Sequence, residues 1–199
     1  MMPISVLTRN LNLDAREVMV YGSLQEGRAD LRGGYRIDWR TQVWPFYLQS
    51  PVTIAGPDTR LTGALRIGLG GLVISGLEGR VGSGFLDRIM MDMSCETTVA
   101  MRDVGLGWGW RSAWAAGVVT ASPGTCRLRG QNVIFPGLEL ELGREGADAT
   151  GDLRTEDMIS VMQMQLRRAR VLELSLQPGA SQIFPQLPER APLRLTVPF

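Results

Sequence analysis

The chain has 199 residues and a formal net charge of +1, and all 21 of its basic residues are arginine because lysine and histidine are absent. Without histidine the chain has no Ser-His or Cys-His nucleophile pair and no imidazole metal ligand. Without lysine it has no Schiff-base residue and no phosphate-loop lysine, so most common enzyme designs are excluded. The small net charge gives no electrostatic reason to expect nucleic acid or an acidic membrane surface as the main partner.

The N-terminal residues predict neither a leader nor a membrane span. Residues 1–7 are too short for a signal peptide and lack its basic flank, and no run of about 18 apolar residues occurs in the chain. The chain is therefore expected to be either cytoplasmic or the part of a longer protein that remains after an anchor is removed. Residues 11–19 could form a short helix that leads into the first strand.

Alternation of apolar and polar residues dominates the rest of the chain. Because successive side chains of a strand point to opposite faces, this period of two predicts strands with one buried face. Glycine and proline turns separate the segments at spacings typical of an antiparallel meander. The apolar positions that alternate in this way are Tyr35, Ile37 and Trp39; Leu61, Leu65, Ile67 and Leu69; Leu138, Leu140 and Leu142; and Leu172, Leu174 and Leu176.

Two later segments need a choice between structures. Residues 157–166 could form a helix by propensity, but Met162, Met164 and Leu166 alternate with polar residues, which favours a strand. The tail from residue 184 to residue 198 contains too many prolines for a central strand. We expect the tail to be an edge strand or a loose end.

These elements predict an all-β protein, built as one elongated, curved antiparallel sheet or as an open sandwich of short strands. We expect a single β domain over residues 1–199. Residues 1–85 and 86–199 both run strand, glycine turn, strand, so the domain could consist of two similar halves.

Two glycine-rich runs, at residues 68–71 and 105–109, resemble nucleotide-binding loops only superficially. A phosphate loop must follow a strand and open a helix whose N-terminus holds the anion. Both runs continue into strand-like sequence, so they are interpreted as bulges or tight crossings of the sheet.

Two groups of charged residues are also candidates for chemistry. Glu139 and Glu141 share one face of a strand, and a solvated face explains them better than an acid/base pair, which must flank a substrate from opposing sides. Arg167, Arg168 and Arg170 could meet phosphate headgroups, although an exposed arginine cluster is the commoner explanation. We therefore expect no catalytic residues, no metal and no cofactor.

Cys95 and Cys126 are the only cysteines. Two thiolates without histidine make at most half a zinc site, and a redox-active pair is normally spaced Cys-x-x-Cys. The alternatives are two unrelated buried thiols or one disulfide, and the even count in strand-like sequence favours the disulfide. A disulfide would indicate an oxidising compartment such as a periplasm.

A candidate hydrophobic face combines alternating aliphatic residues with tryptophan. In the run Trp108-Gly109-Trp110 both indoles would lie on one face of a strand, and the glycine would let a neighbour approach closely. These tryptophans could form a platform for a partner or an acyl chain, but packing in the core is the more common use of tryptophan. The residues of this candidate face are Leu65, Ile67, Leu69, Trp108 and Trp110.

Part of the sequence resembles the type II secretion system protein N family. The resemblance lies in residues 20–29, 37–40, 61–65 and 72–79, which follow the family's glycine-rich opening, its strand with a tryptophan and its paired strands with a leucine–glycine rhythm. It covers residues 20–85, about a third of the chain, and Gln25 stands where the family usually has tryptophan.

The resemblance implies a mainly β domain in the periplasm, tethered to the inner membrane by an anchor that this chain lacks. The family is counted among accessory components of protein export, and it has no catalytic residues to carry over. Our first hypothesis is therefore a non-enzymatic scaffold that contacts other secretion-system envelope proteins. The second hypothesis is a module that binds lipid or another hydrophobic ligand, because such proteins also resemble the sheet segments of bridge-type lipid-transfer proteins.

Overall fold

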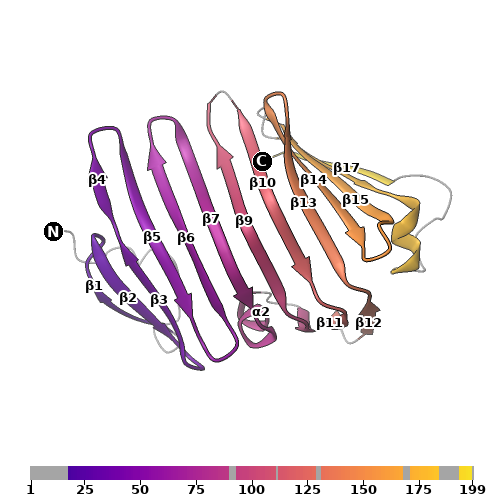
Figure 1. Ribbon diagram of the computed structural model, residues 1–199, viewed down its shortest axis with the longest axis horizontal. Coiled ribbons are helices and arrows are strands. Elements are labelled where there is room, and N and C mark those ends of the chain that lie inside the picture. The colour runs from indigo at the N-terminus through magenta and orange to yellow at the C-terminus, as the bar shows by residue number, and fades with distance from the viewer. Residues whose placement is uncertain are drawn as a thin grey trace.

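One large antiparallel sheet, which stays open, forms most of the part of the chain that the computed structural model describes (Figure 1). It contains 14 strands in the order β1-β2-β3-β5-β6-β7-β9-β10-β13-β14-β15-β16-β17, and β4 pairs with β5 beside β3. Strands that are neighbours in the sheet are therefore almost always neighbours in the chain. The described residues are 18–89, 93–110, 112–128, 131–167, 171–183 and 193–198.

The strands of this main sheet are longest in its middle, and shorter strands lie at both ends. Their bounds are β1 Val18–Gly22, β2 Glu26–Leu31, β3 Tyr35–Arg40, β4 Gln42–Trp44, β5 Tyr47–Ala55, β6 Arg60–Gly68, β7 Gly71–Val81, β9 Val99–Trp108, β10 Ala113–Ala121, β13 Leu138–Glu145, β14 Asp148–Thr155, β15 Ser160–Arg167, β16 Val171–Leu176 and β17 Leu193–Pro198.

Two excursions interrupt this meander, and both occur at the same end of the sheet. Between β7 and β9 the chain forms the helix α2 (Ser83–Ile89) and the strand β8 (Met93–Glu96). Between β10 and β13 it forms β11 (Gly124–Leu128) and β12 (Gln131–Phe135). The two excursions meet in a second, three-stranded sheet with the order β12-β11-β8. We call this end of the main sheet, at the bottom of Figure 1, the α2 end.

The strand registers bring the apolar side chains of the main sheet to one face. Residues directly opposite each other in antiparallel strands point to the same side. Ile54 is opposite Leu61, and Leu140 is opposite both Val119 and Leu153, so the apolar positions of neighbouring strands match. The alternation predicted from the sequence therefore produces one apolar face and one polar face, two names that we keep below.

The apolar face is covered at the α2 end. Phe85 and Leu86 of α2 pack against Tyr35, Leu61 and Val81 of the main sheet, and all five side chains are buried. Further along the sheet the short 3₁₀ helix η1 (Pro178–Gln182) and the three-stranded sheet cover it instead. The buried residues of that second cluster are Phe135, Val161, Ala180 and Ile183.

The sheet bends toward its apolar face between β10 and β14. Ala113, Ala115 and Ala149 are buried together, although β13 lies between their two strands in the sheet order. The Ala113 N–H also donates a hydrogen bond to the Ala147 carbonyl, 2.8 Å away. Because contact across an intervening strand requires curvature, the apolar face is concave here. Gly117, with a φ of 102°, lies at the break in the β9–β10 register and permits a bulge that L side chains disfavour.

A hydrogen-bond network around Asp58 fixes α2 to the sheet. The Asp58 carboxylate accepts hydrogen bonds from the Tyr35 hydroxyl (2.8 Å), the Gly84 N–H (2.8 Å) and the Thr59 hydroxyl (3.0 Å). Desolvation by itself would raise the pKa of Asp58, but these hydrogen bonds outweigh it and leave that pKa below its ordinary value. Burial, followed by the hydrogen bond to Asp58, raises the pKa of Tyr35.

Most of the predicted elements are confirmed. The ambiguous segment at 157–166 contains the strand β15 and no helix, and the described part of the tail, β17, is an edge strand. Of the two predicted architectures the single curved sheet is present, because the second layer is only α2, η1 and a three-stranded sheet. Residues 11–17 of the helix expected at 11–19 lie outside the described residues. Its last two residues, Val18 and Met19, begin strand β1 instead. The division into two similar halves stays a prediction.

The replacement Asp58→Asn should reduce the loss of stability that the protein shows as the pH falls into the acid range. Because the folded-state pKa of Asp58 is lowered, its contribution to stability is present above its unfolded pKa and is lost as the pH falls through the folded value. We expect the variant to be about 1–2 kcal/mol less stable at neutral pH, with a smaller difference below pH ~4, as measured by urea unfolding. Asp157→Asn, an exposed carboxylate in the β14–β15 turn, is the control and should change little at any pH. If the free energies of unfolding of the wild type and of Asp58→Asn differed by the same amount at pH 7 and at pH 3, this explanation would be contradicted.

Candidate functional site

Over β4 to β9, no described element covers the apolar face at the end of the main sheet opposite α2. We call this the tip end, because the hairpins β4–β5, β6–β7 and β9–β10 turn there (Figure 1). One row of directly opposed apolar residues crosses five strands near this end. It consists of Val43, Leu48, Ile67, Leu72 and Trp108, whose exposed fractions are 67, 43, 48, 40 and 36%.

A second apolar row lies next to the first, one pleat closer to the α2 end. Leu65 is opposite Ile74, and Ile74 is opposite Leu106, which is 41% exposed. Beyond the second row, toward the α2 end, Leu77 lies against Gly63 and packs against the buried cluster around α2. The covered core therefore begins directly next to this row. Together the two rows form a surface of exposed apolar side chains that adjoins the protein core on one side and the hairpin tips on the other.

The turns that join the central strands at the tip end carry large apolar side chains that are mostly exposed. Phe46 in the β4–β5 turn is 72% exposed, Leu69 in the β6–β7 turn is 79% exposed and Trp110 in the β9–β10 turn is 88% exposed. Trp44 stacks on Tyr47 beside the first of these turns, with ring centroids 5.8 Å apart. The Arg66 guanidinium lies 5.5 Å from the centroid of the Tyr47 ring, within the range of a cation–π contact.

A hollow of about 310 Å³ lies between two of these turns. Its lining includes Leu69, Trp108, Trp110, Trp114 and Val73. The Trp114 indole reaches the hollow because it lies flat over two glycines of β9, at positions where any Cβ atom would collide with the ring. Gly105 and Gly107 therefore allow the Trp114 ring to pack closely against strand β9. Residues 68–71 form the hairpin turn between β6 and β7. Neither glycine-rich run opens a helix.

Three of the five residues predicted for the hydrophobic face meet in this hollow. These are Leu69, Trp108 and Trp110, whereas Leu65 and Ile67 lie in the two apolar rows and do not line it. The five residues thus share one end of the sheet, but they do not form the continuous groove that the lipid hypothesis predicted. Two details of the sequence interpretation are wrong: β6 ends before Leu69 and β9 ends before Trp110, so both side chains lie in turns.

Packing in the core, the preferred interpretation of the tryptophans, is wrong for the most exposed of them. Trp110 is 88% exposed and Trp44 is 49% exposed. Trp39 fits the core interpretation better, since it is half-buried and its indole N–H donates to the Ser23 carbonyl at 3.2 Å. The close approach expected at Gly109 is present, because the Gly70 backbone lies directly against it.

The sequence interpretation missed Trp44, Phe46, Leu72 and Leu106. The first two belong to the run Trp44-Pro45-Phe46-Tyr47, in which three aromatic residues surround a proline that marks a turn. This run could have been recognised as an aromatic hairpin tip. The contribution of Leu72 and Leu106 could not, because it depends on the register that places both beside Trp108 and Ile74.

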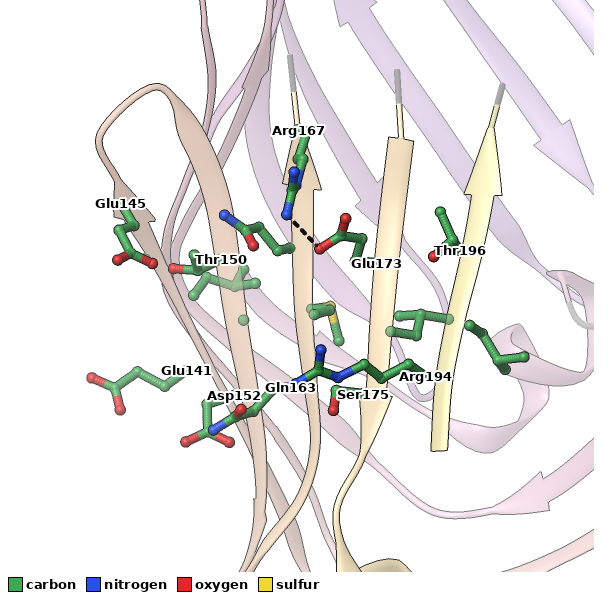
Figure 2. A pocket seen from close by; sticks show the side chains of 17 residues that line it. Glu141, Glu145, Thr150, Asp152, Gln163, Arg167, Glu173, Ser175, Arg194 and Thr196 are labelled. Carbon is green, nitrogen blue, oxygen red and sulfur yellow. Dashed lines mark hydrogen bonds and ion pairs between the residues drawn. The ribbon is translucent and has the colours of Figure 1, made fainter. Parts of the chain in front are cut away.

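Two larger hollows lie on the polar face, one near each end of the strand order. The one over β13–β17 has a volume of about 790 Å³, and Figure 2 shows polar side chains from these strands around it. Its charges are largely paired: Arg167 binds Glu173 at 2.9 Å, and Asp152 accepts from Arg154 and, at 2.7 Å, from the Ser160 hydroxyl. The hollow over β1–β5, about 740 Å³, likewise contains the Arg28–Asp38 ion pair. These arrangements fit a solvated, ion-paired sheet surface.

The charged candidates from the sequence belong to the same polar face. Glu139 and Glu141 point to it, and Glu141 pairs with Arg154 at 3.3 Å. The hydrogen bond and charge of Asp152, with a smaller contribution from Glu141, raise the pKa of Arg154. Arg167 is paired with Glu173, while Arg168 and Arg170 lie outside the described residues.

The described residues contain neither a cluster of metal ligands nor a membrane-spanning helix. No three of their Cys, Asp or Glu side chains come together as metal ligands. No helix among them is long and apolar enough to cross a membrane.

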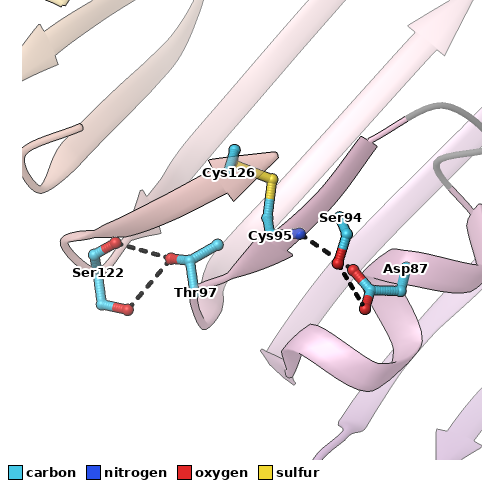
Figure 3. Close-up of a disulfide and its surroundings, with 6 residues drawn as sticks. All are labelled: Asp87, Ser94, Cys95, Thr97, Ser122 and Cys126. Carbon is cyan, nitrogen blue, oxygen red and sulfur yellow. Dashed lines mark hydrogen bonds between the residues drawn. A yellow bond between two sulfur atoms is a disulfide. The ribbon is translucent and has the colours of Figure 1, made fainter. Parts of the chain in front are cut away.

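A disulfide joins Cys95 of β8 to Cys126 of β11, as the sequence predicted (Figure 3). It links the two excursions from the main sheet, and its residues are directly opposed in the three-stranded sheet. The Cys95 N–H donates to the Asp87 carboxylate of α2 at 3.0 Å, and the Ser94 hydroxyl donates to the same carboxylate at 3.1 Å. The disulfide is thereby connected to the helix that covers the core.

Replacing both cysteines, Cys95→Ala with Cys126→Ala, should destabilise the protein without changing its fold. The bond closes a loop with a sequence separation of 31 residues, for which the chain-entropy model gives about 3–4 kcal/mol. Urea unfolding should show this loss, and a reducing agent should lower the stability of the wild type by a similar amount. The double variant is the internal control, because a reducing agent should not affect it. Equal stabilities of the oxidised wild type and the variant would contradict a stabilising role.

No family model, no curated protein and no solved structure matches this chain. Nothing in these comparisons bears on the resemblance to the type II secretion system protein N family, which stays a prediction.

Proposed function

We propose that this protein is a non-enzymatic binding module whose uncovered apolar rows hold the acyl chains of a lipid or a similar amphiphile. The observation that carries the proposal is the alignment of half-exposed Leu48, Ile67, Leu72, Leu106 and Trp108 on one face at the tip end. Isolated apolar residues on a surface are ordinary, but aligned rows of them usually serve to bind something.

The dimensions of the surface suit an acyl chain. The first row runs from Val43 in β4 across to Trp108 in β9, so it spans five strands. At ~4.8 Å between strands this is about 19 Å, more than the roughly 15 Å that an acyl chain covers in half of a bilayer core. The bend at β10–β14 makes the face concave beside this row, which increases the area that a bound chain can bury.

The chemistry of the surface also fits such a ligand. Its driving force would be removal of apolar area from water, about 25 cal/mol per Å². The side chains of both rows are aliphatic or aromatic and carry no formal charge, whereas the charged residues of the same strands point to the polar face. A polar headgroup would therefore remain outside the rows, toward solvent.

Two glutamates, one in each apolar row, should weaken the binding of fatty acids. We expect Leu48→Glu combined with Leu106→Glu to weaken the affinity for a fluorescent fatty acid at least about tenfold, because an acyl chain would have to desolvate two carboxylates. Gln49→Glu is the matched control, since Gln49 follows Leu48 on β5 but points to the polar face, and it should bind normally. Native mass spectrometry of the purified wild type should reveal bound lipid. Wild-type protein that binds neither added fatty acid nor endogenous lipid would refute the proposal.

We propose as a second candidate function an accessory role in a type II secretion machinery, through contacts with other envelope proteins. The edge strand β17 favours it: Leu193, Leu195 and Val197 are 40, 51 and 47% exposed, and no described strand pairs with the outer side of β17. An exposed apolar edge strand can add a strand from a partner. The Cys95–Cys126 disulfide supports an oxidising compartment such as a periplasm.

Leu195→Lys should separate this role from lipid binding. Binding of the immobilised protein to periplasmic domains of secretion components should weaken at least about tenfold, because a lysine on an edge strand opposes strand addition and apolar contact. Thr196→Lys is the control for added charge, since its side chain points to the polar face, and it should bind more tightly than Leu195→Lys. Fatty-acid binding should not change in either variant. If the two variants bind the partner domains equally well, the apolar side of β17 is not the surface that contacts them.

A further inference from the structure

The hairpin turns at the tip end present apolar side chains that neither the core nor the apolar rows use. Phe46, Leu69 and Trp110 come from three different hairpins, and each exposes at least 72% of its surface. Trp44, which is 49% exposed, stands beside Phe46. We refer to these four residues as the tip surface. Hairpin turns usually carry polar residues and glycine, so large apolar residues in three of them in succession require an explanation.

The three turns are arranged along one edge of the sheet. Figure 1 shows the β4–β5, β6–β7 and β9–β10 turns side by side at the top of the molecule, pointing the same way. Their strands are consecutive in the sheet order, from β5 through β6, β7 and β9 to β10. Side chains that project beyond the ends of neighbouring strands reach a flat partner together. In the next hairpin of the sheet order, β13–β14, Glu145 is directly opposite Asp148 beside the turn, so carboxylates follow the tip surface on this side.

The charge of this edge differs from that of the α2 end. No Asp or Glu occurs in residues 39–57, 59–77 or 104–138, which contain all three turns and the strand segments next to them. Arg66 of β6, whose guanidinium lies 5.5 Å from the centroid of the Tyr47 ring, places a cation beside the first of these turns. The α2 end, in contrast, carries carboxylates that include Asp58, Asp87 and Glu156.

We propose that the tip surface docks on a phospholipid bilayer that contains anionic lipid, with Phe46, Leu69 and Trp110 inserted into the interface between headgroups and acyl chains. Tryptophan and tyrosine concentrate at this interface because one part of each ring is apolar and the other can bind polar groups. Apolar side chains and a cation in the absence of carboxylates suit an anionic bilayer. A bilayer also suits three separate tips better than a protein groove, because it is flat and adapts to each side chain.

This docking is independent of a bound acyl chain, since Phe46, Leu69 and Trp110 lie in turns and the acyl rows lie on the sheet face. It would nevertheless place the open end of the apolar rows against the membrane. Leu72 and Trp108, the directly opposed row residues nearest these turns, lie three and two residues along the chain from Leu69 and Trp110. A chain that leaves the bilayer could then reach the rows without crossing water.

Co-sedimentation of the full chain with vesicles of phosphatidylcholine and phosphatidylglycerol tests the proposal. We expect the triple variant Phe46→Ser, Leu69→Ser and Trp110→Ser to bind at least about tenfold more weakly than the wild type, because three apolar side chains no longer leave water. The control Ile134→Ser with Met158→Ser removes two apolar residues that are 77 and 63% exposed and lie away from the tip surface. It should bind as the wild type does, and both variants should keep the wild-type unfolding midpoint. The acyl-row variant Leu48→Glu with Leu106→Glu is measured in parallel.

Quenching by lipids brominated along the acyl chain locates the contact. The wild type should lose more tryptophan fluorescence on such vesicles than Trp110→Phe, since Trp110 is the most exposed indole. Absence of wild-type binding, equal loss in the tip and control variants, or quenching that Trp110→Phe does not change would each overturn the proposal. Vesicle binding without fatty-acid binding would refute only the acyl-chain function, and fatty-acid binding without vesicle binding would refute only the docking.

Discussion

The match of register between neighbouring strands is the constraint on which the rest of the structure depends. Each strand alternates apolar and polar residues. If one strand slipped by one residue against its neighbour, all of its apolar side chains would move to the opposite face. The pairs Ile54–Leu61, Leu140–Leu153 and Leu174–Leu195 show the same register rule at widely separated points of the sheet. Because the rule holds from β3 to β17, the apolar face is continuous, and everything that covers or uses that face has a defined place.

Partial coverage of the continuous face divides the molecule into a stable end and an exposed end. At the α2 end Phe85 and Leu86 close over the sheet, and the Asp58 network and the Cys95–Cys126 disulfide hold the covering elements. Both excursions are inserted at this end, so the opposite end keeps only simple hairpin turns. Two of the three buried clusters therefore lie beneath covering elements, and the exposed rows and the tip surface lie where no described element covers the sheet.

Much of the fold could be predicted, because alternation is a local signal. The strands around Tyr35–Trp39, Leu138–Leu142 and Leu172–Leu176 follow from it directly, and so does the choice of strand over helix before Arg167. The disulfide followed from the even count of cysteines and their strand-like context. The candidate site was predicted less well: Leu65, Ile67 and Trp108 lie on the apolar face, but Leu69 and Trp110 lie in turns because β6 and β9 end one residue or two before them.

The sequence by itself determined that this protein is β, that its strands have one apolar side, and that catalysis by histidine or lysine is excluded. Composition and period suffice for these conclusions, since both are properties of single segments. Only the tertiary structure decided which part of the apolar face is covered and that Phe46, Leu69 and Trp110 share an edge. These properties depend on contacts between segments far apart in the chain, such as α2 with β3 and β8 with β11, and no local pattern records such contacts.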